Sequence, residues 1–173
     1  GVKHRYDSII WPRLDGGTSP YRYRLSVEET LAVDLADPER VSERNKSGQK
    51  MAGVPVRKGY AISCGAGLWS SHIDCTGAMS ACMMLRKPSY DLLRMPFTEA
   101  WAKLAEIRKI KRSRNNRCED CLANDLCSQC AGWSQLVHHD FETPDEYICA
   151  LGKLRMSKFG SVISEPILEG SYE

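Results

Sequence analysis

The sequence predicts an α+β fold in which a small β-hairpin and several helices surround metal-binding loops. Segments with strand-like sequence patterns flank a tight turn at 74–77, and this arrangement is typical of a β-hairpin. An apolar stripe at helical spacing runs through 97–110. Most of the eight cysteines fall in short, regular spacings. Because loop-borne Cys-x-x-Cys pairs are typical ligands of zinc and iron–sulfur centres, metal binding is the first chemistry to consider.

The N-terminal segment predicts a strand followed by helix. An apolar run at 9–11 stands before a proline and indicates a short buried strand. Ser26 and Glu29 have the spacing of a capping box, which predicts a helix that begins there. Asp37-Pro38 interrupts this helix, and the polar segment through 48 is either a second short helix or a connector.

Further along, strands at 68–73 and 78–85 form the predicted hairpin. The helix at 97–110 has Thr98 as a candidate N-cap, and lysines and arginines gather at its C-terminal end, where cations suit the helix dipole. The cysteine-rich stretch 118–130 is predicted to be a loop. A last helix is expected to open at 143–146, with Thr143 as N-cap, and to carry Cys149 on its second turn.

Charge and hydropathy exclude several classes of protein. A net charge of +2 in 173 residues is too small for a dedicated binder of polyanions. The longest apolar stretches are far shorter than the roughly 20 residues that span a bilayer. The chain starts without an initiator Met or the apolar region of a secretory signal, so we expect a fragment of a longer cytoplasmic protein. A disulfide-bonded secreted domain would also use eight cysteines, but the paired spacings favour metal binding in a reducing compartment.

Two zinc interpretations are open. Cys118, Cys121, Cys127 and Cys130 have the number and type of ligands for one four-thiolate zinc site. That site leaves Cys64, Cys82 and Cys149 unexplained, and its five-residue gap is short for two zinc knuckles. A nucleic-acid-binding zinc module would use a nearby basic run, although a solvated helix end is the favoured interpretation because no aromatic residue interleaves the charges. The run consists of Arg108, Lys109, Lys111, Arg112, Arg114 and Arg117.

The pair His138-His139 with Asp140 suggests a proton relay. Adjacent histidines on a loop are more often surface polar residues, and no Ser or Cys nucleophile accompanies these. We therefore assign no catalytic residue in this chain.

A family resemblance accounts for more of the cysteines. The pattern Cys64-x12-Gly77-x4-Cys82, Cys118-x2-Cys121-x5-Cys127-x2-Cys130 and then Cys149 resembles the seven-cysteine signature of the SPASM domain, the C-terminal extension of peptide-modifying radical S-adenosylmethionine enzymes. Cys64-Gly65-Ala66-Gly67 is similar to the usual opening of that domain. The resemblance covers about 64–150; residues 1–35 resemble more weakly the last strand and helix of the family's partial barrel.

The resemblance implies two auxiliary 4Fe-4S clusters. Cys64, Cys82 and Cys130 would hold the first, and Cys118, Cys121, Cys127 and Cys149 the second. Two features depart from the family pattern. Cys127 and Cys130 are separated by two residues where three are common, and Ser70 stands where some members have a further cysteine. Cys75 lies at the hairpin tip, too far from Cys82 to be a ligand of the first cluster. The fourth ligand position of that cluster is therefore expected to be open or filled by a non-cysteine group.

The resemblance also implies the parent protein and its partners. Residues 1–50 would be the end of a radical S-adenosylmethionine barrel and 51–173 the auxiliary cluster domain. The implied partners are a peptide or protein substrate, the N-terminal barrel and an electron donor such as flavodoxin or ferredoxin. The family's Cys-x3-Cys-x2-Cys motif is absent from the printed sequence. S-adenosylmethionine would therefore bind only in the parent enzyme, and zinc is the expected substitute if iron is not supplied.

Overall fold

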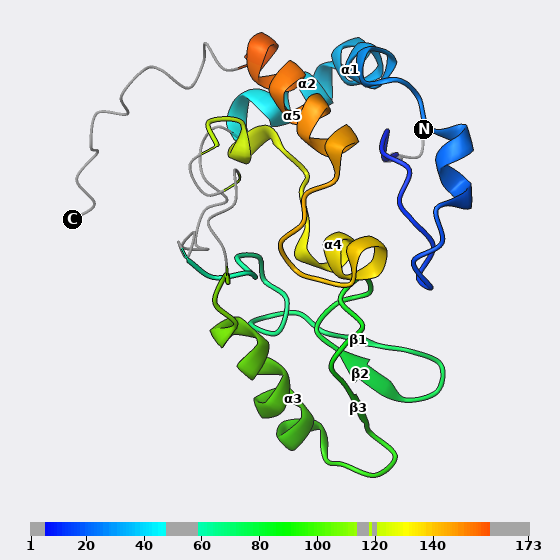
Figure 1. Ribbon diagram of the computed structural model, residues 1–173, viewed down its shortest axis with the longest axis vertical. Helices are drawn as coiled ribbons and strands as arrows, with labels where there is room; N and C mark the ends of the chain where they lie inside the picture. The colour runs from blue at the N-terminus through cyan, green and yellow to red at the C-terminus, as the bar shows by residue number, and fades with distance from the viewer. Residues whose placement is uncertain (1–5, 48–58, 114–117, 119–120, 160–173) are drawn as a thin grey trace, which may run out of the picture.

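The chain forms an α+β structure with three helices at one end and a small sheet with a further helix at the other (Figure 1). The computed structural model describes residues 6–47, 59–113, 118 and 121–159. One end of the molecule in Figure 1 holds α1 (Val27–Ala36), α2 (Pro38–Ser47) and α5 (Glu146–Phe159). The other end holds the strands and α3 (Phe97–Ala105), and α4 (Ala131–His138) lies between the two ends.

The predicted hairpin is present, but its strands are short and a third strand joins them. β1 (His72–Ile73), β2 (Ala78–Ser80) and β3 (Ser89–Asp91) form an antiparallel sheet in that order. The prediction that β2 continues to Leu85 was wrong. Beyond Ser80 the backbone turns, and the Leu85 amide donates to the Cys82 Sγ at 3.2 Å instead of pairing with a neighbouring strand.

The turn between β1 and β2 is organised by the Asp74 carboxylate. Its Oδ1 accepts hydrogen bonds from the Thr76 amide at 2.9 Å, the Thr76 hydroxyl at 2.7 Å and the Ala78 amide at 3.1 Å. Its Oδ2 pairs with the Arg86 guanidinium at 2.7 Å. The bonds from Thr76 and Ala78, helped by Arg86, lower the pKa of Asp74 to about 2.

We expect Asp74→Asn to lower the thermal unfolding midpoint in a pH-dependent way. A carboxyl whose pKa is lower in the folded state than in the unfolded state stabilises the fold above its unfolded pKa. That contribution is lost as pH falls from about 4 toward about 2, so the two midpoints should converge there. Glu28→Gln, at an exposed site in α1, is the control and should leave the pH dependence unchanged. A constant gap between wild type and Asp74→Asn at every pH would contradict the prediction.

The capping-box prediction for α1 is confirmed. The Ser26 hydroxyl accepts from the Glu29 amide at 3.1 Å, and the Ser26 amide donates to the Glu29 carboxylate at 2.8 Å. α1 ends before Asp37, whose carboxylate accepts from the amides of Glu39 and Arg40 at the start of α2. The segment after Asp37 is therefore a second helix, the first of the two alternatives.

Three local predictions were wrong. Residues 9–11 form no strand, because the Asp7 carboxylate accepts from the Ile9 amide at 3.0 Å and the Trp11 indole at 2.9 Å and holds this segment in a turn. Pro96, not Thr98, occupies the N-cap position of α3. α3 also ends at Ala105 and continues only as a 3-10 turn at Glu106–Lys109.

The start of α5 also differs from the prediction. Asp145, not Thr143, receives an amide of the first turn, from Ile148 at 3.1 Å. The Thr143 hydroxyl donates to the Asp140 carboxylate at 2.6 Å and stabilises the preceding loop. Since α5 begins at Glu146, Cys149 lies in the first turn of that helix.

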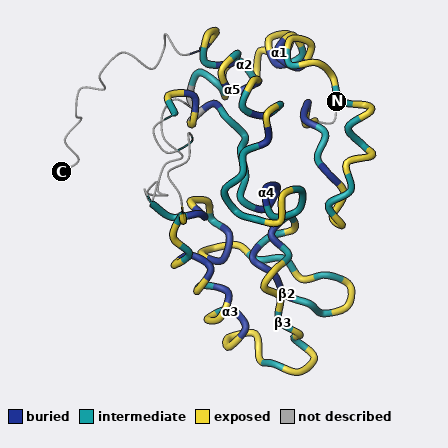
Figure 2. Tube along the Cα trace, in the orientation of Figure 1, coloured by how far each residue is buried: buried dark blue, intermediate teal, exposed yellow. Residues whose placement is uncertain are grey.

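Buried residues, dark blue in Figure 2, form separate hydrophobic clusters. The sheet and α3 enclose one core around Met79 and Leu104. Trp133 of α4 and Leu151 of α5 form another with the N-terminal segment. Cys82 packs against the first core, whereas Cys127 and Cys130 pack against the second, so each core has cysteines on its border.

Residues from both predicted domains pack together in this structure. α1 packs against α5, and the Thr30 and Tyr147 hydroxyls are 2.7 Å apart. The proposed division into 1–50 and 51–173 therefore crosses a packed surface. Every helix in the described ranges is too short or too polar to cross a bilayer.

Candidate metal centres

The structure separates seven cysteines into two groups around two cavities. The second cysteine group lines a cavity of about 260 Å³ and consists of Cys118, Cys121, Cys127 and Cys149. The first cysteine group borders a cavity of about 160 Å³ and consists of Cys64, Cys82 and Cys130. Cys118 also lies on the wall of this smaller cavity. The other six cysteines each line one cavity, along the division that the family resemblance implies, and the ligand sets themselves stay a prediction.

Two elements bring the second cysteine group together. The turn at 121–127 contains a short 3-10 helix, Asn124–Leu126, which reverses the chain between Cys121 and Cys127. α5 supplies Cys149 and also packs closely on Cys127. A Cβ at Gly152 would lie 3.0 Å from the Cys127 Cβ and 3.3 Å from its Sγ, so a larger residue would push Cys127 away from α5. Lys153, on the next position of α5, places a cation on the cavity wall.

The first cysteine group joins three separate segments. Cys64 belongs to the loop before the sheet, Cys82 follows β2, and Cys130 is the N-cap residue of α4. α4 approaches the Cys82 segment closely at Gly132, where a Cβ would lie 2.9 Å from the Met84 Cβ and 3.0 Å from the Leu85 amide nitrogen. Glycine at 132 therefore lets the start of α4 bring Cys130 toward Cys82.

Burial and neighbouring thiols disfavour the thiolate form in both groups. Burial raises the pKa of the Cys127 thiol to about 11, a hydrogen bond from the Gln129 amide opposes it, and Cys149 and the other two thiols of its group raise it further. Burial likewise raises the pKa of the Cys130 thiol. Six of the seven cysteines in these groups are half-buried, and Cys64 is exposed. Thiols gathered around one space are stabilised as thiolates by a bound cationic centre, because metal ligation replaces the lost protons. The thiols of each cavity are the type of donor that iron–sulfur clusters bind.

Cys75, which we did not expect to be a metal ligand, lines neither cavity. It is exposed in the turn between β1 and β2. Ser70 is also exposed, and its hydroxyl donates to the Gly65 carbonyl at 3.2 Å. The wall of the smaller cavity contains, besides Cys118, the oxygen-bearing side chains of Gln129, Ser134 and Glu142.

Arg108 and Arg112 were not expected near the site. The sequence favoured a solvated helix end for the basic run, and for these two residues that interpretation was wrong. Arg108 is buried and its guanidinium donates to the Cys64 carbonyl, while the Arg112 Nε donates to the Tyr60 carbonyl at 3.1 Å. Both cations hold the segment that carries Cys64, and Arg112 also lines the smaller cavity. Arg114 and Arg117 lie outside the described residues.

The histidine pair lies away from the cysteines. His138 ends α4 and His139 follows it in a left-handed conformation with φ 60°. Neither histidine lines a cysteine cavity. Asp140 accepts hydrogen bonds from the Glu142 and Thr143 amides, so its carboxylate organises the loop before α5.

The structure does not gather the four ligands of the simple zinc site. Cys130 lines the smaller cavity with Cys64 and Cys82, whereas the larger cavity has Cys149 in its place. In the ranges that the structure describes, no three His, Cys, Asp or Glu side chains form a group that could hold a single metal ion. The thiols of the second group instead surround a space.

Comparison with known proteins found no family, curated protein or solved structure that matches this chain.

Proposed function

We propose that this chain is an auxiliary iron–sulfur domain of a radical S-adenosylmethionine enzyme that modifies a ribosomally made peptide or protein. The observation that supports it most is the separation of seven cysteines between two cavities, with Cys149 in one and Cys130 in the other. A 4Fe-4S cluster binds one thiolate on each iron, so it suits thiols that surround a space. When bound, such clusters supply one-electron transfer or an iron site for a substrate heteroatom.

Residues around the first cysteine group have defined supporting roles in this proposal. The Leu85 amide donates to the Cys82 Sγ, and hydrogen bonds to ligand sulfur raise the reduction potential of a cluster. The buried Arg108 guanidinium stabilises negative charge beside Cys64. With three thiolates, the centre keeps one position for a non-cysteine ligand or a substrate atom.

The first test compares Cys82→Ser with Cys75→Ser after anaerobic reconstitution with iron and sulfide. Wild type and Cys75→Ser should each bind about eight irons per chain and show a visible absorption band that bleaches on reduction. Cys82→Ser should lose about four irons, because two thiolates are too few to hold the first cluster. Iron, sulfide and zinc analysis measures the result. One or two zinc ions with no iron would instead support a non-catalytic zinc-binding module, and iron loss in Cys75→Ser would contradict our ligand assignment.

A second prediction uses the two close-packed glycines as reciprocal controls. Gly152→Ala should displace Cys127 and reduce iron in the second centre, whereas Gly132→Ala should separate Cys130 from Cys82 and reduce iron in the first. Overpacking of this kind typically destabilises a fold by about 1–3 kcal/mol. Electron paramagnetic resonance of the reduced proteins distinguishes the centres. Loss of the same signal in both variants would contradict the separation into two sites.

A further inference from the structure

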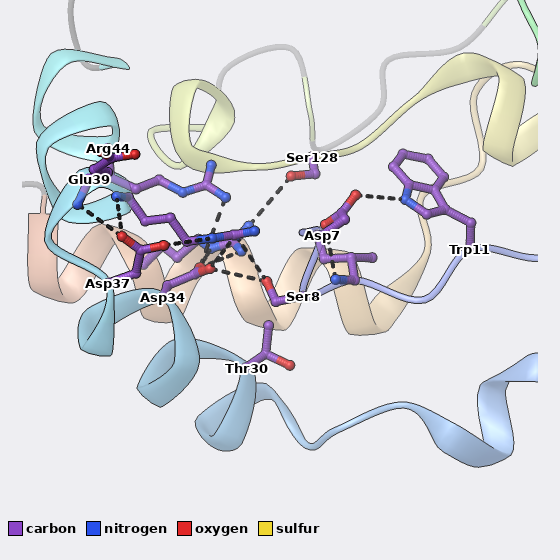
Figure 3. Close-up of polar contacts among 12 residues, drawn as sticks. Asp7, Ser8, Trp11, Thr30, Asp34, Asp37, Glu39, Arg44 and Ser128 are labelled. Atoms are coloured by element: carbon purple, nitrogen blue, oxygen red, sulfur yellow. Dashed lines mark hydrogen bonds and ion pairs between the residues drawn. The ribbon is translucent and has the colours of Figure 1, made fainter. Parts of the chain in front are cut away.

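Between α1, α2 and α5, the fully buried Arg155 and the partly buried Arg40 and Arg44 all lie near one buried carboxylate, Asp34. Arg40 also lies 3.8 Å from the Asp37 carboxylate. Asp34 is fully buried, and Figure 3 shows arginine side chains converging on it. The Asp34 Oδ1 accepts from the Ser8 hydroxyl and the Arg40 Nη1, each at 3.0 Å. Its Oδ2 accepts from the Arg155 Nε at 2.8 Å and Nη2 at 2.5 Å. Four donors fill the roughly four lone-pair positions of a carboxylate.

Of the three arginines around Asp34, Arg44 lies farthest from its carboxylate, so its positive charge is the least neutralised by Asp34. Its Nη2 lies 3.9 Å from the Asp34 Oδ2, beyond hydrogen-bond distance, although its side chain is only 23% exposed. Burial lowers the pKa of Arg44, and repulsion from Arg155 and Arg40 adds to this, against the attraction of Asp34 and Asp7. A second anion beside Arg44 would therefore stabilise the charged guanidinium.

A cavity of about 580 Å³ lies beside Arg44, within the size range of small-molecule sites. Arg40 and Arg44 contribute positive charge to its wall, and Ser128 contributes a hydroxyl. The Ser128 hydroxyl also accepts from the Arg155 Nη1 at 3.4 Å, so a third cation lies behind the wall.

Two carboxylates on the same wall limit what can bind. Asp7 uses both oxygens to accept from the Ile9 amide and the Trp11 indole (Figure 3). Glu43 lies on an exposed position of α2. These acids oppose a dense polyanion but leave the Arg44 side of the cavity favourable for one small anionic group, since the planar guanidinium fork matches a single oxyanion.

We propose that this cavity binds a small oxyanion, a carboxylate or a phosphate group, with Arg44 as its principal ligand and Arg40 and Ser128 as further donors. The site is independent of the cysteine cavities and of any metal. It would recognise the anionic group of a small molecule or of a peptide, because both present the same planar or tetrahedral oxygen set to the guanidinium.

Calorimetric titration of the 173-residue chain with inorganic phosphate and with acetate tests the proposal, at constant ionic strength maintained with sodium chloride. Wild type should bind at least one of the two anions at millimolar concentration. Tighter binding of phosphate would identify a phosphate site, and tighter binding of acetate a carboxylate site. Arg44→Gln should weaken binding about tenfold or more, because a charge-assisted hydrogen bond is lost. Arg94→Gln, whose side chain is 89% exposed, is the control and should bind like wild type.

A second measurement keeps the test decisive if Arg44→Gln does not fold. The guanidinium resonance of Arg44 in wild-type protein should shift as phosphate or acetate is added, and Arg44→Lys should bind more weakly than wild type because it lacks the fork. No heat and no Arg44 shift with either anion would overturn the proposal. Equal affinities in wild type and a folded Arg44→Gln would also overturn it.

Discussion

Asp34→Asn is expected to lower the free energy of unfolding by about 3–5 kcal/mol, because it removes the buried carboxylate that pairs with the fully buried Arg155 guanidinium. Arg155 is fully buried, and the Arg40 side chain is only 13% exposed. Arg155 comes from α5, which packs against α1, so its guanidinium cannot regain water without opening that packing. The neutral amide accepts only through its one oxygen, and its NH2 group would face arginine donors without offsetting their charge, so we expect the loss to be large.

Chemical denaturation followed by circular dichroism measures this loss, with Asp91→Asn as the matched control. The Asp91 carboxylate pairs with the Arg94 Nε at 3.3 Å, but both side chains are exposed. Exposed ion pairs contribute about 0–1 kcal/mol, so the control should unfold nearly like wild type. Similar losses in the two variants would mean that Asp34 contributes no more than a surface pair.

Elements specified by nearby residues were predictable from the sequence. The α1 start was correct because the two residues of its capping box are three positions apart and satisfy each other. The strand at 9–11 was wrong because apolar spacing alone cannot distinguish a strand from an irregular buried segment, and the Asp7 carboxylate selects the latter. β3 was missed because Ser89–Asp91 is too short to show an alternating pattern.

α4 was missed for a different reason. It begins at Ala131, directly after the stretch 118–130 that cysteine spacing marked as loop, and it contains Gly132, which is a poor helix former. The glycine is needed for contact with the Met84 segment, which is distant in sequence. The glycine therefore weakens the helix signal in the local sequence, although the contact with the Met84 segment requires a glycine at this position.

The two sets of cysteines could be proposed from spacing and family resemblance. The residues that pack around them, and the buried charges elsewhere, could not be predicted from the sequence. Arg108 belongs to a run that looks solvated, and its burial depends on a contact with Cys64, 44 positions away. The Asp34 cluster combines residues from α1, α2 and α5, so no short window of sequence contains it. Charge compensation of this kind is set by packing between elements rather than by local propensity.

Cys149→Ser is expected to remove about half of the iron from the reconstituted chain, about four of eight irons. Cys149 lies in the first turn of α5 and is the one member of the second cysteine group that a helix supplies. Removing its thiol leaves three thiolates, all from loops, and no ligand from α5. Three thiolates are too few for a stable four-thiolate centre. Cys130→Ser should also lose about four irons, but from the first centre.

Iron analysis with electron paramagnetic resonance of the reduced variants separates these outcomes. Each single variant should retain the signal that the other loses, and the double variant should retain neither. Under the simple zinc interpretation, Cys130→Ser would lose the metal, whereas Cys149→Ser would keep it, because Cys149 is not a ligand of that site. Cys149 is thus the residue at which the two interpretations predict opposite results, since Cys130 and Cys149 line different cavities.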